Sequence, residues 1–307
     1  MSSEQRERIE VSVVVASVES VHSIGRCLDA MTAALAGIAA EVFVIDASSD
    51  GTAEIAEQKL GRERVVRCVP GTLTPDLWAI GIARTTGRIV ALTTGHFVVG
   101  PTWIGSLSSA LVERRLGVAG RVDLRDDATV IDWAVFYLRY SDFLEASGLP
   151  LAEVRGIPAD NAAYDGDAAR QFVRASGDGF WEVEFHRQLH GRGQTLALVS
   201  GATGWYGRSF PFRTILEHRF HHGRHAGAWR ARTGDRPAAA IVLASPAVPI
   251  LLAARTWSRV RASVAHRRRF IRSLPAFLAL GAAWAVGEAV GALTGAPAAR
   301  RTAPASA

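Results

Sequence analysis

The sequence predicts an α/β fold in which an open, mostly parallel sheet is flanked by helices. Short apolar runs rich in β-branched residues recur between residues 11 and 122, as expected of strands buried on both faces of such a sheet. Segments with apolar residues at helical spacing separate these runs. With 307 residues and 49% hydrophobic residues, the chain is long enough for one large or two modest domains.

The elements of this first part alternate in a regular order. The expected strands are VSVVVA, EVFVID, RVVRCV, RIVALTT and GVAGRV. An apolar stripe that begins at Ile24 and Cys27 predicts the helix between the first two. Prolines at positions 75 and 101 stand where the first turn of a helix tolerates them. In such a sheet, ligands bind at the carboxyl ends of the strands.

Residues 123–235 have a less regular pattern. We expect an aromatic-rich helix over residues 130–144, an extended segment IPADNAAY, and a helix that buries Trp181, Phe185 and Leu189. A strand TLALVS and a basic, histidine-rich helix or loop over residues 210–230 follow.

The charge and the cysteines restrict the class of partner. The net charge is +6, and Lys59 is the only lysine among 35 basic residues. This balance favours anionic lipid or phosphate, and no nucleic acid, as partner. Cys27 and Cys68 lack a CxxC pattern, so neither a disulfide framework nor a zinc site is expected. The short apolar run after the polar N-terminus predicts no signal peptide.

The C-terminal part differs in composition from the rest. Two uncharged apolar runs, residues 237–254 and 273–287, flank a connector at 255–272 that holds seven arginines. Because a bilayer span takes about 20 apolar residues, an interfacial or re-entrant hairpin on anionic headgroups fits both runs. The alternative is a buried helical pair of a soluble protein. We therefore expect one domain over residues 1–235, with halves at about 11–122 and 123–235, and a membrane-associated region over 236–307.

The segment VFVIDASSDGT, residues 42–52, is the first candidate site. A carboxylate at the end of a buried strand, here Asp46, can accept hydrogen bonds from a sugar hydroxyl or a base N–H. The alternative is a helix cap and turn before residue 52, for which Ser49 and Asp50 suffice.

The order of these segments resembles the family 2 glycosyltransferases of the GT-A fold. VSVVVASVES, then EVFVIDASSDGTAE, then ARTTGRIVALTTGHFVVGPTWI are similar to that family's first strand and turn, its D-x-G-S-x-D-G-T motif, and its segment that leads to D-x-D and P-x-W. The resemblance covers roughly residues 11–230. It implies a nucleotide-sugar donor, with Ala16, Glu19 and Asp46 near the base or ribose.

The resemblance fails at the family's metal motif. The D-x-D positions fall on Thr94, Gly95 and His96, so both carboxylates that would hold Mg²⁺ or Mn²⁺ are missing. His96 is the candidate ligand for such a cation, although one neutral imidazole suits hard Mg²⁺ poorly. A hydrogen bond from His96 or Thr94 to the donor phosphate, or a structural role for His96, are the alternatives.

The segment GDGFWEVEFHRQLHGRG, residues 177–193, looks like the family's acceptor side. The resemblance assigns Glu182 as general base, with Trp181 beside it at the acceptor. Inversion needs such a base because the acceptor hydroxyl loses its proton as it attacks. If Glu182 is not the base, Glu184 and Asp178 are the next candidates. The alternative is a solvated helix face on which Glu182 pairs with His186.

Two further segments contain candidate site residues. Asn161 in NAAY resembles an acceptor-side amide, although a strand-edge asparagine before a turn is equally ordinary. In EHRFHHGRHAGAWRAR, residues 217–232, Arg219, His222 and Arg224 are candidates to replace the charge of a metal at the diphosphate. An exposed basic loop at lipid headgroups is the alternative.

These features predict an inverting glycosyltransferase at the cytoplasmic face of the cell membrane. It would move a sugar from a nucleotide donor to a lipid-linked or envelope-glycan acceptor. The alternative is a membrane-tethered, non-catalytic subunit that binds nucleotide or glycan. A dinucleotide-dependent oxidoreductase is disfavoured because the turn after the first strand, ASVESVHSIG, has no GxGxxG.

Overall fold

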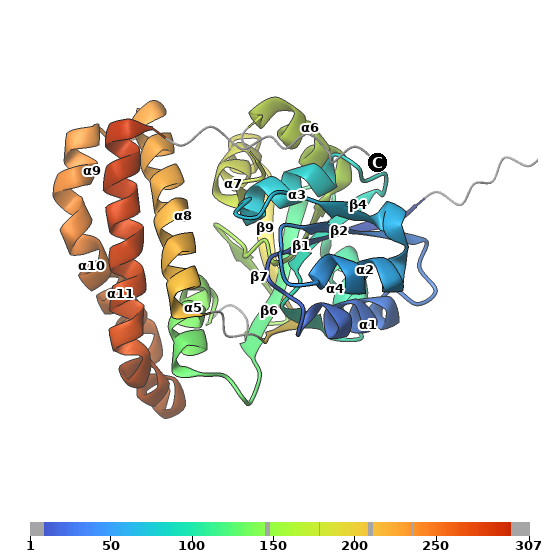
Figure 1. Ribbon diagram of the computed structural model, residues 1–307, viewed down its shortest axis with the longest axis horizontal. Helices are drawn as coiled ribbons and strands as arrows, with labels where there is room; N and C mark the ends of the chain where they lie inside the picture. Colours follow the sequence, from blue (N-terminus) through green and yellow to red (C-terminus); the bar gives the residue numbers. More distant parts are fainter. Residues whose placement is uncertain (1–8, 145–147, 178, 208–210, 235, 296–307) are drawn as a thin grey trace, which may run out of the picture. The chain divides into compact units, whose positions relative to one another are not determined.

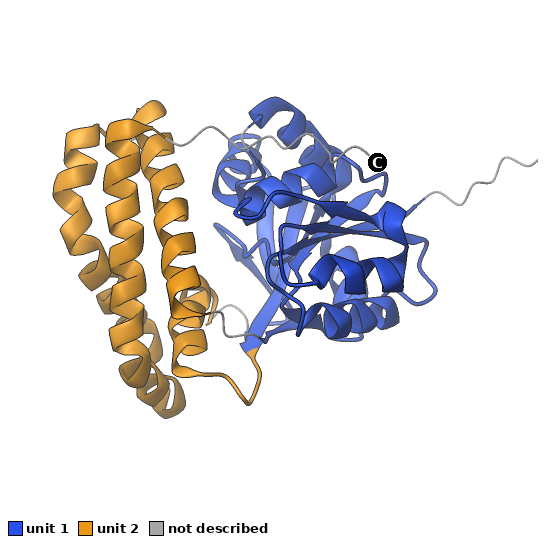
Figure 2. Ribbon diagram, in the orientation of Figure 1, with its two compact units in different colours: residues 1–123, 145–207, 299–307 blue, residues 124–144, 208–298 orange. Residues whose placement is uncertain are grey.

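The computed structural model describes residues 9–144, 148–177, 179–207, 211–234 and 236–295. The chain forms two compact units (Figure 2). Unit 1 holds residues 1–123, 145–207 and 299–307, and unit 2 holds residues 124–144 and 208–298. Residues 211–234 and 236–295 both belong to unit 2.

Unit 1 is built on one mixed sheet of nine strands within the described residues. The strands are β1 (Val11–Ser17), β2 (Ala40–Asp46), β3 (Val65–Arg67), β4 (Ile89–Thr94), β5 (Phe97–Val99), β6 (Arg115–Leu124), β7 (Leu151–Val154), β8 (Asn161–Asp165) and β9 (Thr195–Tyr206). Their order is β3-β2-β1-β4-β8-β6-β9-β5, with β7 paired to β9. The first four are parallel, as the apolar runs predicted. β8 runs antiparallel between β4 and β6.

Helices cover both faces of this sheet (Figure 1). They are α1 (Ile24–Ala34), α2 (Thr52–Leu60), α3 (Thr74–Ile82), α4 (Trp103–Ala110), α6 (Gly166–Ser176) and α7 (Glu182–Gly191), with a 3₁₀ turn η1 (Arg62–Arg64). One core joins α1 and α4 to the sheet through side chains such as Leu28, Met31 and Trp103, all of them buried. On the other face, Gly81 of α3 lies so close to Val14 that a β-carbon would collide with it.

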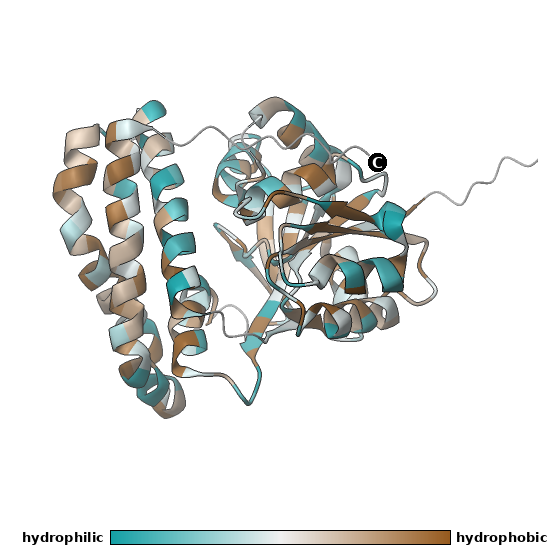
Figure 3. Cartoon of the chain, viewed as in Figure 1, coloured by the Kyte–Doolittle hydropathy of each residue, from teal (hydrophilic) through white to brown (hydrophobic). Residues whose placement is uncertain are grey.

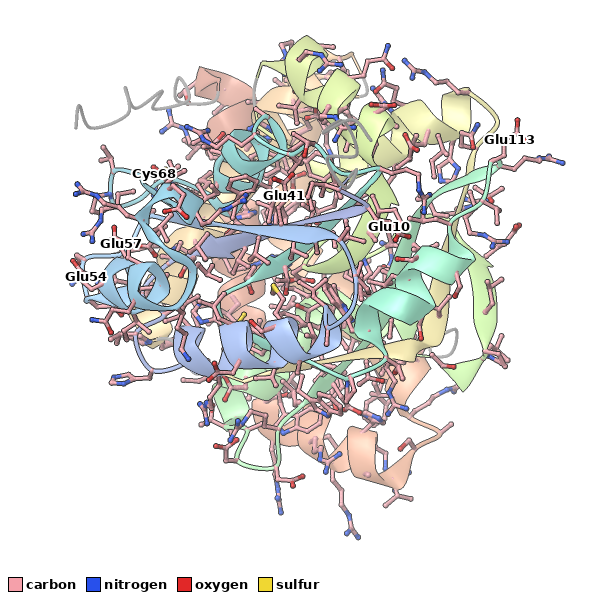
Figure 4. The ribbon with its side chains drawn as sticks, turned by 90° about the vertical axis from the view of Figure 1, so that its right-hand side faces the viewer. Glu10, Glu41, Glu54, Glu57, Cys68 and Glu113 are labelled. Atoms are coloured by element: carbon pink, nitrogen blue, oxygen red, sulfur yellow. The ribbon has the colours of Figure 1, made fainter. Side chains whose placement is uncertain are left out.

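The edge of the sheet is tied to α2 by ion pairs. Arg67 of β3 donates from Nε to Glu57 at 2.9 Å and from Nη1 to Glu54 at 2.7 Å. Figure 4 labels both glutamates on α2. All three side chains are at least partly exposed, so these pairs contribute little to stability.

Apart from Leu124, which ends β6, the regular structure of unit 2 within its described residues is helical. It comprises α5 (Val130–Tyr140), α8 (Phe212–Arg232), α9 (Ala238–Ala244), α10 (Val248–Val260) and α11 (Val264–Thr294), with 3₁₀ turns η2 (Ser141–Phe143) and η4 (Ser245–Ala247). A capping box between Thr129 and Asp132 begins α5, and Ser263 caps α11. The basic segment after residue 210 is thus a helix rather than a loop.

α11 is the central helix of unit 2. α8 packs along it with glycines at the contact, and α5, α9 and α10 pack on it as well. An aromatic cluster joins α5 to the first turns of α11. In it, the Tyr137 hydroxyl contacts His266 Nδ1 at 3.2 Å, and the Arg269 guanidinium lies 4.4 Å from the Trp133 ring centroid.

Candidate active site

The sheet register brings three strand ends together at one edge of unit 1. Ser17 at the end of β1 pairs with Asp46 at the end of β2, and Ala16 pairs with Thr94 at the end of β4. The candidate nucleotide residues from three separated segments are therefore neighbours. Ala16 is buried within the sheet at 3% exposure, and its carbonyl accepts a hydrogen bond from the Gly95 N–H at 3.0 Å.

Asp46 is buried beneath the loop that follows it. Its carboxylate accepts hydrogen bonds from Ser48 Oγ at 2.6 Å and from the Ser48 backbone N–H at 3.2 Å. The residue is 2% exposed. Burial raises the pKa of Asp46, while the hydrogen bonds from Ser48 act in the opposite direction.

Glu19 links the loops after β1 and β2. Its backbone N–H donates to Ser48 Oγ at 2.7 Å, and its carboxylate accepts from the N–H and hydroxyl of Ser49 at 2.9 and 3.0 Å. Glu19 has φ of 46°, a positive value found at no other non-glycine residue in the described part of the chain. A left-handed backbone at a non-glycine residue is a strained conformation that marks functional loops.

The turn at the D-x-D positions is closed by serines. His96 is 6% exposed, and its Nδ1 lies 3.3 Å from both Ser20 Oγ and Ser23 Oγ. A β-carbon at Gly95 would come within 2.9 Å of the hydroxyls of Ser17 and Ser20. The loop after β1 thus packs directly on the Thr94–His96 turn.

This arrangement does not fit a divalent cation. Thr94 and His96 offer a hydroxyl and a buried imidazole that already contacts two serines. Within the described residues, no group of three His, Cys, Asp or Glu side chains is placed to hold a metal ion. A hard cation needs several oxygen ligands, and the side chains of this turn do not supply them.

Glu182 begins α7, with Trp181 as its N-cap residue. Both side chains are half-buried. A carboxylate in the first turn of a helix is stabilised in its charged form by the helix dipole. The inner face of α7 is anchored by Phe185 and Leu189, both 1% exposed, as the sequence predicts. Trp181, which was expected in the same buried stripe, precedes the helix and is only half-buried.

His186 of the same helix faces the core. Its Nε2 lies 2.9 Å from the Tyr164 hydroxyl of β8. Burial, with a smaller effect of His190, lowers the pKa of His186 to about 3. The ring is therefore neutral near pH 7, and it cannot form the Glu182–His186 ion pair that the sequence left open.

The pKa of Tyr164 is affected by two carboxylates, those of Glu182 and Asp160. Its pKa is raised well above the usual value, first by burial and then by the charges of Glu182 and Asp160. Asp160 is 2% exposed and was not assigned from the sequence. The only sequence signal was its place in the PADNAAY segment.

The side chain of Asn161 links neighbouring elements at the centre of the sheet through hydrogen bonds. Its Oδ1 accepts from Trp103 Nε1 at 2.7 Å, and its Nδ2 donates to the carbonyls of Arg121 and Ala202 at 2.9 and 3.3 Å. The side chain is fully buried, and both amide hydrogens are used. This geometry supports the ordinary structural alternative over direct contact with an acceptor.

Arg219, His222 and Arg224 belong to α8 in unit 2. Arg224 donates from Nε to the Gly295 carbonyl at 3.3 Å. Burial lowers the pKa of Arg219 to about 10, with a smaller effect of Arg139. Burial also lowers the pKa of His222 well below its usual value. Their predicted contact with a diphosphate rests on their charge and their position in the sequence.

Glu184 and Asp178 are the other carboxylates that the sequence offers as base. Glu184 lies in the first turn of α7, half-buried. Asp178 lies outside the described residues.

Comparison with known proteins agrees with this fold. Residues 12–170 match the family model described as Glycosyl transferase family 2. Because the match covers more than half of the chain, the chain belongs to this family and is a glycosyltransferase. No curated protein resembles the sequence closely enough to be detected.

Solved structures share the architecture at low sequence identity. Residues 1–349 of Staphylococcus aureus TarS, in complex with UDP-GlcNAc, superpose with a TM-score of 0.52 and 12% identity, covering 89% of this chain and 90% of that one. Glucosyl-3-phosphoglycerate synthase from Mycobacterium tuberculosis gives 0.45 and 17%, covering 67% and 74%. The similarity to TarS confirms the GT-A fold.

Proposed function

We propose that the chain is an inverting glycosyltransferase that moves a sugar from a nucleotide-diphosphate donor to a lipid-linked or envelope-glycan acceptor. The observation that carries this proposal is the polar cluster at the carboxyl ends of β1, β2 and β4 in a family 2 chain. In open α/β sheets this edge is where ligands bind.

The nucleotide half of the site is formed by Ala16, Glu19 and Asp46. The two carboxylates are held by serine hydroxyls and N–H groups, so their positions are fixed before a donor arrives. Such carboxylates accept hydrogen bonds from ribose hydroxyls or a base N–H. The complex of TarS with UDP-GlcNAc supports a donor of this class.

The diphosphate would be stabilised by neutral donors and arginines rather than by a metal. Thr94 and His96 can donate hydrogen bonds to phosphate oxygens, and Arg219, His222 and Arg224 are the proposed cationic and polar contacts. Arginine binds phosphate through two parallel hydrogen bonds. A family enzyme that uses Mg²⁺ or Mn²⁺ would gain the same neutralisation of the leaving group from the ion.

Glu182 is the proposed general base. Its carboxylate would take the proton of the acceptor hydroxyl while that oxygen bonds to the anomeric carbon and the bond to the diphosphate breaks. Trp181, directly before it, would contact the acceptor. Asn161 would act by holding Trp103 and the backbone of β6 and β9.

An acceptor at a membrane is supported by the composition of unit 2. Residues Ala238–Val260 and Val264–Thr294 are long and apolar enough to cross a bilayer by length and composition. The arginine-rich connector adjoins both, which favours the cytoplasmic, anionic face of the membrane.

A ligand screen tests the donor class. Thermal shifts of the purified chain are measured with different nucleoside diphosphates, with and without Mn²⁺, because a ligand that binds only the folded state raises the melting temperature. We expect one nucleobase to stabilise the chain without Mn²⁺. Transfer from that donor in membranes then separates an active enzyme from a binding subunit.

A further inference from the structure

The outer side of α9 and α10 carries an uncovered apolar surface. We define the outer stripe as Ala239, Leu243, Ala247, Ile250, Leu251 and Ala254. These residues recur at helical spacing and all are exposed, with Leu243 at 82% and Ile250 at 68%. The opposite side of the same helices packs inward through residues such as Ile241 and Val260. No charged residue occurs from 237 to 254.

The stripe ends at a belt of positive charge. Arg255, Arg261, Arg267, Arg268 and Arg272 are all exposed, and Trp257 stands beside them at 41% exposure. The sequence has no Asp or Glu from 236 to 287. An apolar stripe that adjoins exposed arginines and a tryptophan has the chemistry of a surface for anionic lipid headgroups and the acyl boundary.

The apolar part of α11 is covered on one side by α8. The two helices run parallel, and glycines bring their backbones into contact. A β-carbon at Gly287 would collide with the Phe220 carbonyl, and one at Gly291 with the Arg224 carbonyl. A β-carbon at Gly227 would likewise collide with the Glu288 carbonyl. α8 is therefore fixed beside residues 284–294.

The helix that covers α11 is strongly polar. Arg230 of α8 forms an ion pair with the buried Glu288 and lies 5.5 Å from the Trp284 ring centroid. Figure 3 shows hydrophilic residues along much of α8, whereas α9 and α10 are mainly hydrophobic. If α11 crossed a bilayer, α8 would be carried to the same depth with its arginines. Arginine at bilayer depth is among the most costly residues.

The order of the segments along the chain also argues against a membrane-spanning hairpin. In a two-span hairpin, the connector with seven arginines would lie on the opposite side of the membrane from residues 1–236. Arginine-rich connectors resist translocation. Neither helix is then expected to complete a span.

We propose that unit 2 binds an anionic bilayer in the plane of the interface through the outer stripe, and that neither α10 nor α11 crosses the membrane. The inference rests on the membrane association proposed above. It specifies which face contacts lipid and on which side the connector lies.

Vesicle binding by the full chain tests the contact face. The double substitution L243E/I250E should reduce co-sedimentation with phosphatidylglycerol-containing vesicles about tenfold or more, because it places charge in the apolar contact. L149E is the matched control, since Leu149 is 53% exposed in unit 1, and it should bind as the parent does. Binding should also fall on raising the salt concentration. Unchanged binding of L243E/I250E would overturn the proposal.

A second copy of the chain is the competing occupant of the stripe. If L243E/I250E converts a dimer to a monomer in solution and leaves vesicle binding intact, the stripe is a dimer contact and the proposal is wrong.

Sidedness tests the absence of a span. A36C and A262C are made separately in a C68S background. Ala36 is exposed in unit 1, Ala262 is exposed in the connector, and the remaining Cys27 is buried. An impermeant maleimide should label both positions from the same side of sealed membranes. Labelling from opposite sides would establish a two-span hairpin. Both experiments use no donor or acceptor, so their outcome is independent of the glycosyl-transfer proposal.

Discussion

The hydroxyl of Tyr164 and Nε2 of His186 lie 2.9 Å apart in the core of unit 1. This contact joins the strand β8 to the inner face of α7, whose first residue is Glu182. The phenyl rings of Phe180 and Phe185 pack around Tyr164, with centroids 5.5 and 5.3 Å away. The position of the proposed base is thus set by a buried polar pair within an aromatic cluster.

This pair predicts a loss of stability in acid. The pKa of His186 is lowered from 6.5 to about 3 by burial, so the unfolded chain binds more protons between these values. The free energy of unfolding should therefore fall as the pH drops from about 6.5 toward 3, by up to about 1.4 kcal/mol per pH unit. Chemical denaturation across this range measures it.

The variant H186Q isolates the contribution of His186. Glutamine can either donate to or accept from the Tyr164 hydroxyl, but it does not titrate. Other groups contribute equally to both proteins, so the difference in slope belongs to His186. Equal pH dependence of parent and variant would show that the imidazole is not held neutral.

Asp46 predicts an effect on nucleotide binding. D46N keeps the shape of the buried side chain, so the melting temperature should change little, while the loss of an acceptor for ribose or base should weaken nucleotide binding. A charged hydrogen bond is worth about 1.5–3 kcal/mol, or roughly ten- to a hundredfold in affinity. Calorimetric titration measures the change. D29N, at a residue whose side chain is 67% exposed, serves as control, and equal affinities of D46N and D29N would remove Asp46 from the pocket.

Asn161 predicts a structural effect. N161A removes the acceptor of Trp103 Nε1 and both amide donors of a fully buried side chain. Leaving such groups unsatisfied costs about 1–3 kcal/mol each, so the free energy of unfolding should drop by at least about 2 kcal/mol. A variant as stable as the parent but poor in acceptor binding would restore Asn161 as a direct acceptor contact.

The Thr94–His96 turn predicts weak or absent dependence on divalent metal. R219A or R224A should damage transfer more than H96A, by about ten- to a hundredfold for each lost charged contact to phosphate. R213A is the control on α8, since its side chain is 90% exposed and pairs with Glu217. Melting temperatures verify folding. Loss of activity in EDTA and its recovery with Mn²⁺ would contradict this prediction. His96 would then be a metal ligand, and the arginines would not be required to neutralise the diphosphate.

The strands of the nucleotide half could be predicted from the sequence because they are short apolar runs rich in β-branched residues. β1, β2 and β4 are largely buried, whereas the edge strand β3 is only partly buried. The helices α1, α5 and α7 were equally evident, since residues such as Leu28 and Phe185 recur at helical spacing and are buried. Antiparallel β8 between β4 and β6 could not be placed, because strand order depends on long-range pairing that local pattern does not encode.

At the site, the sequence did not allow us to predict which polar side chains are buried. The motif located Asp46 and His96 at strand ends, but the serines that close over them come from loops whose packing the sequence does not reveal. Asn161 appears in the sequence as a strand-edge polar residue, and only the structure shows Trp103 donating to it. The packing of α8 on α11 was not predicted from the sequence either. Glycines spaced four residues apart on each helix are typical of close helix packing.

The most direct test of the account is transfer by E182Q. The amide keeps the shape of Glu182 and removes its basicity, so donor affinity should equal that of the parent. Loss of a general base commonly lowers the rate by about 10²–10⁴. Transfer by the purified full chain in membranes, from the donor that the thermal-shift screen identifies, measures both quantities. If Glu182 is the base, donor binding by E182Q is unchanged and transfer is reduced by that factor. Transfer by E182Q at close to the parent rate would contradict it, and Asp160 and Glu184 would then be the carboxylates to test.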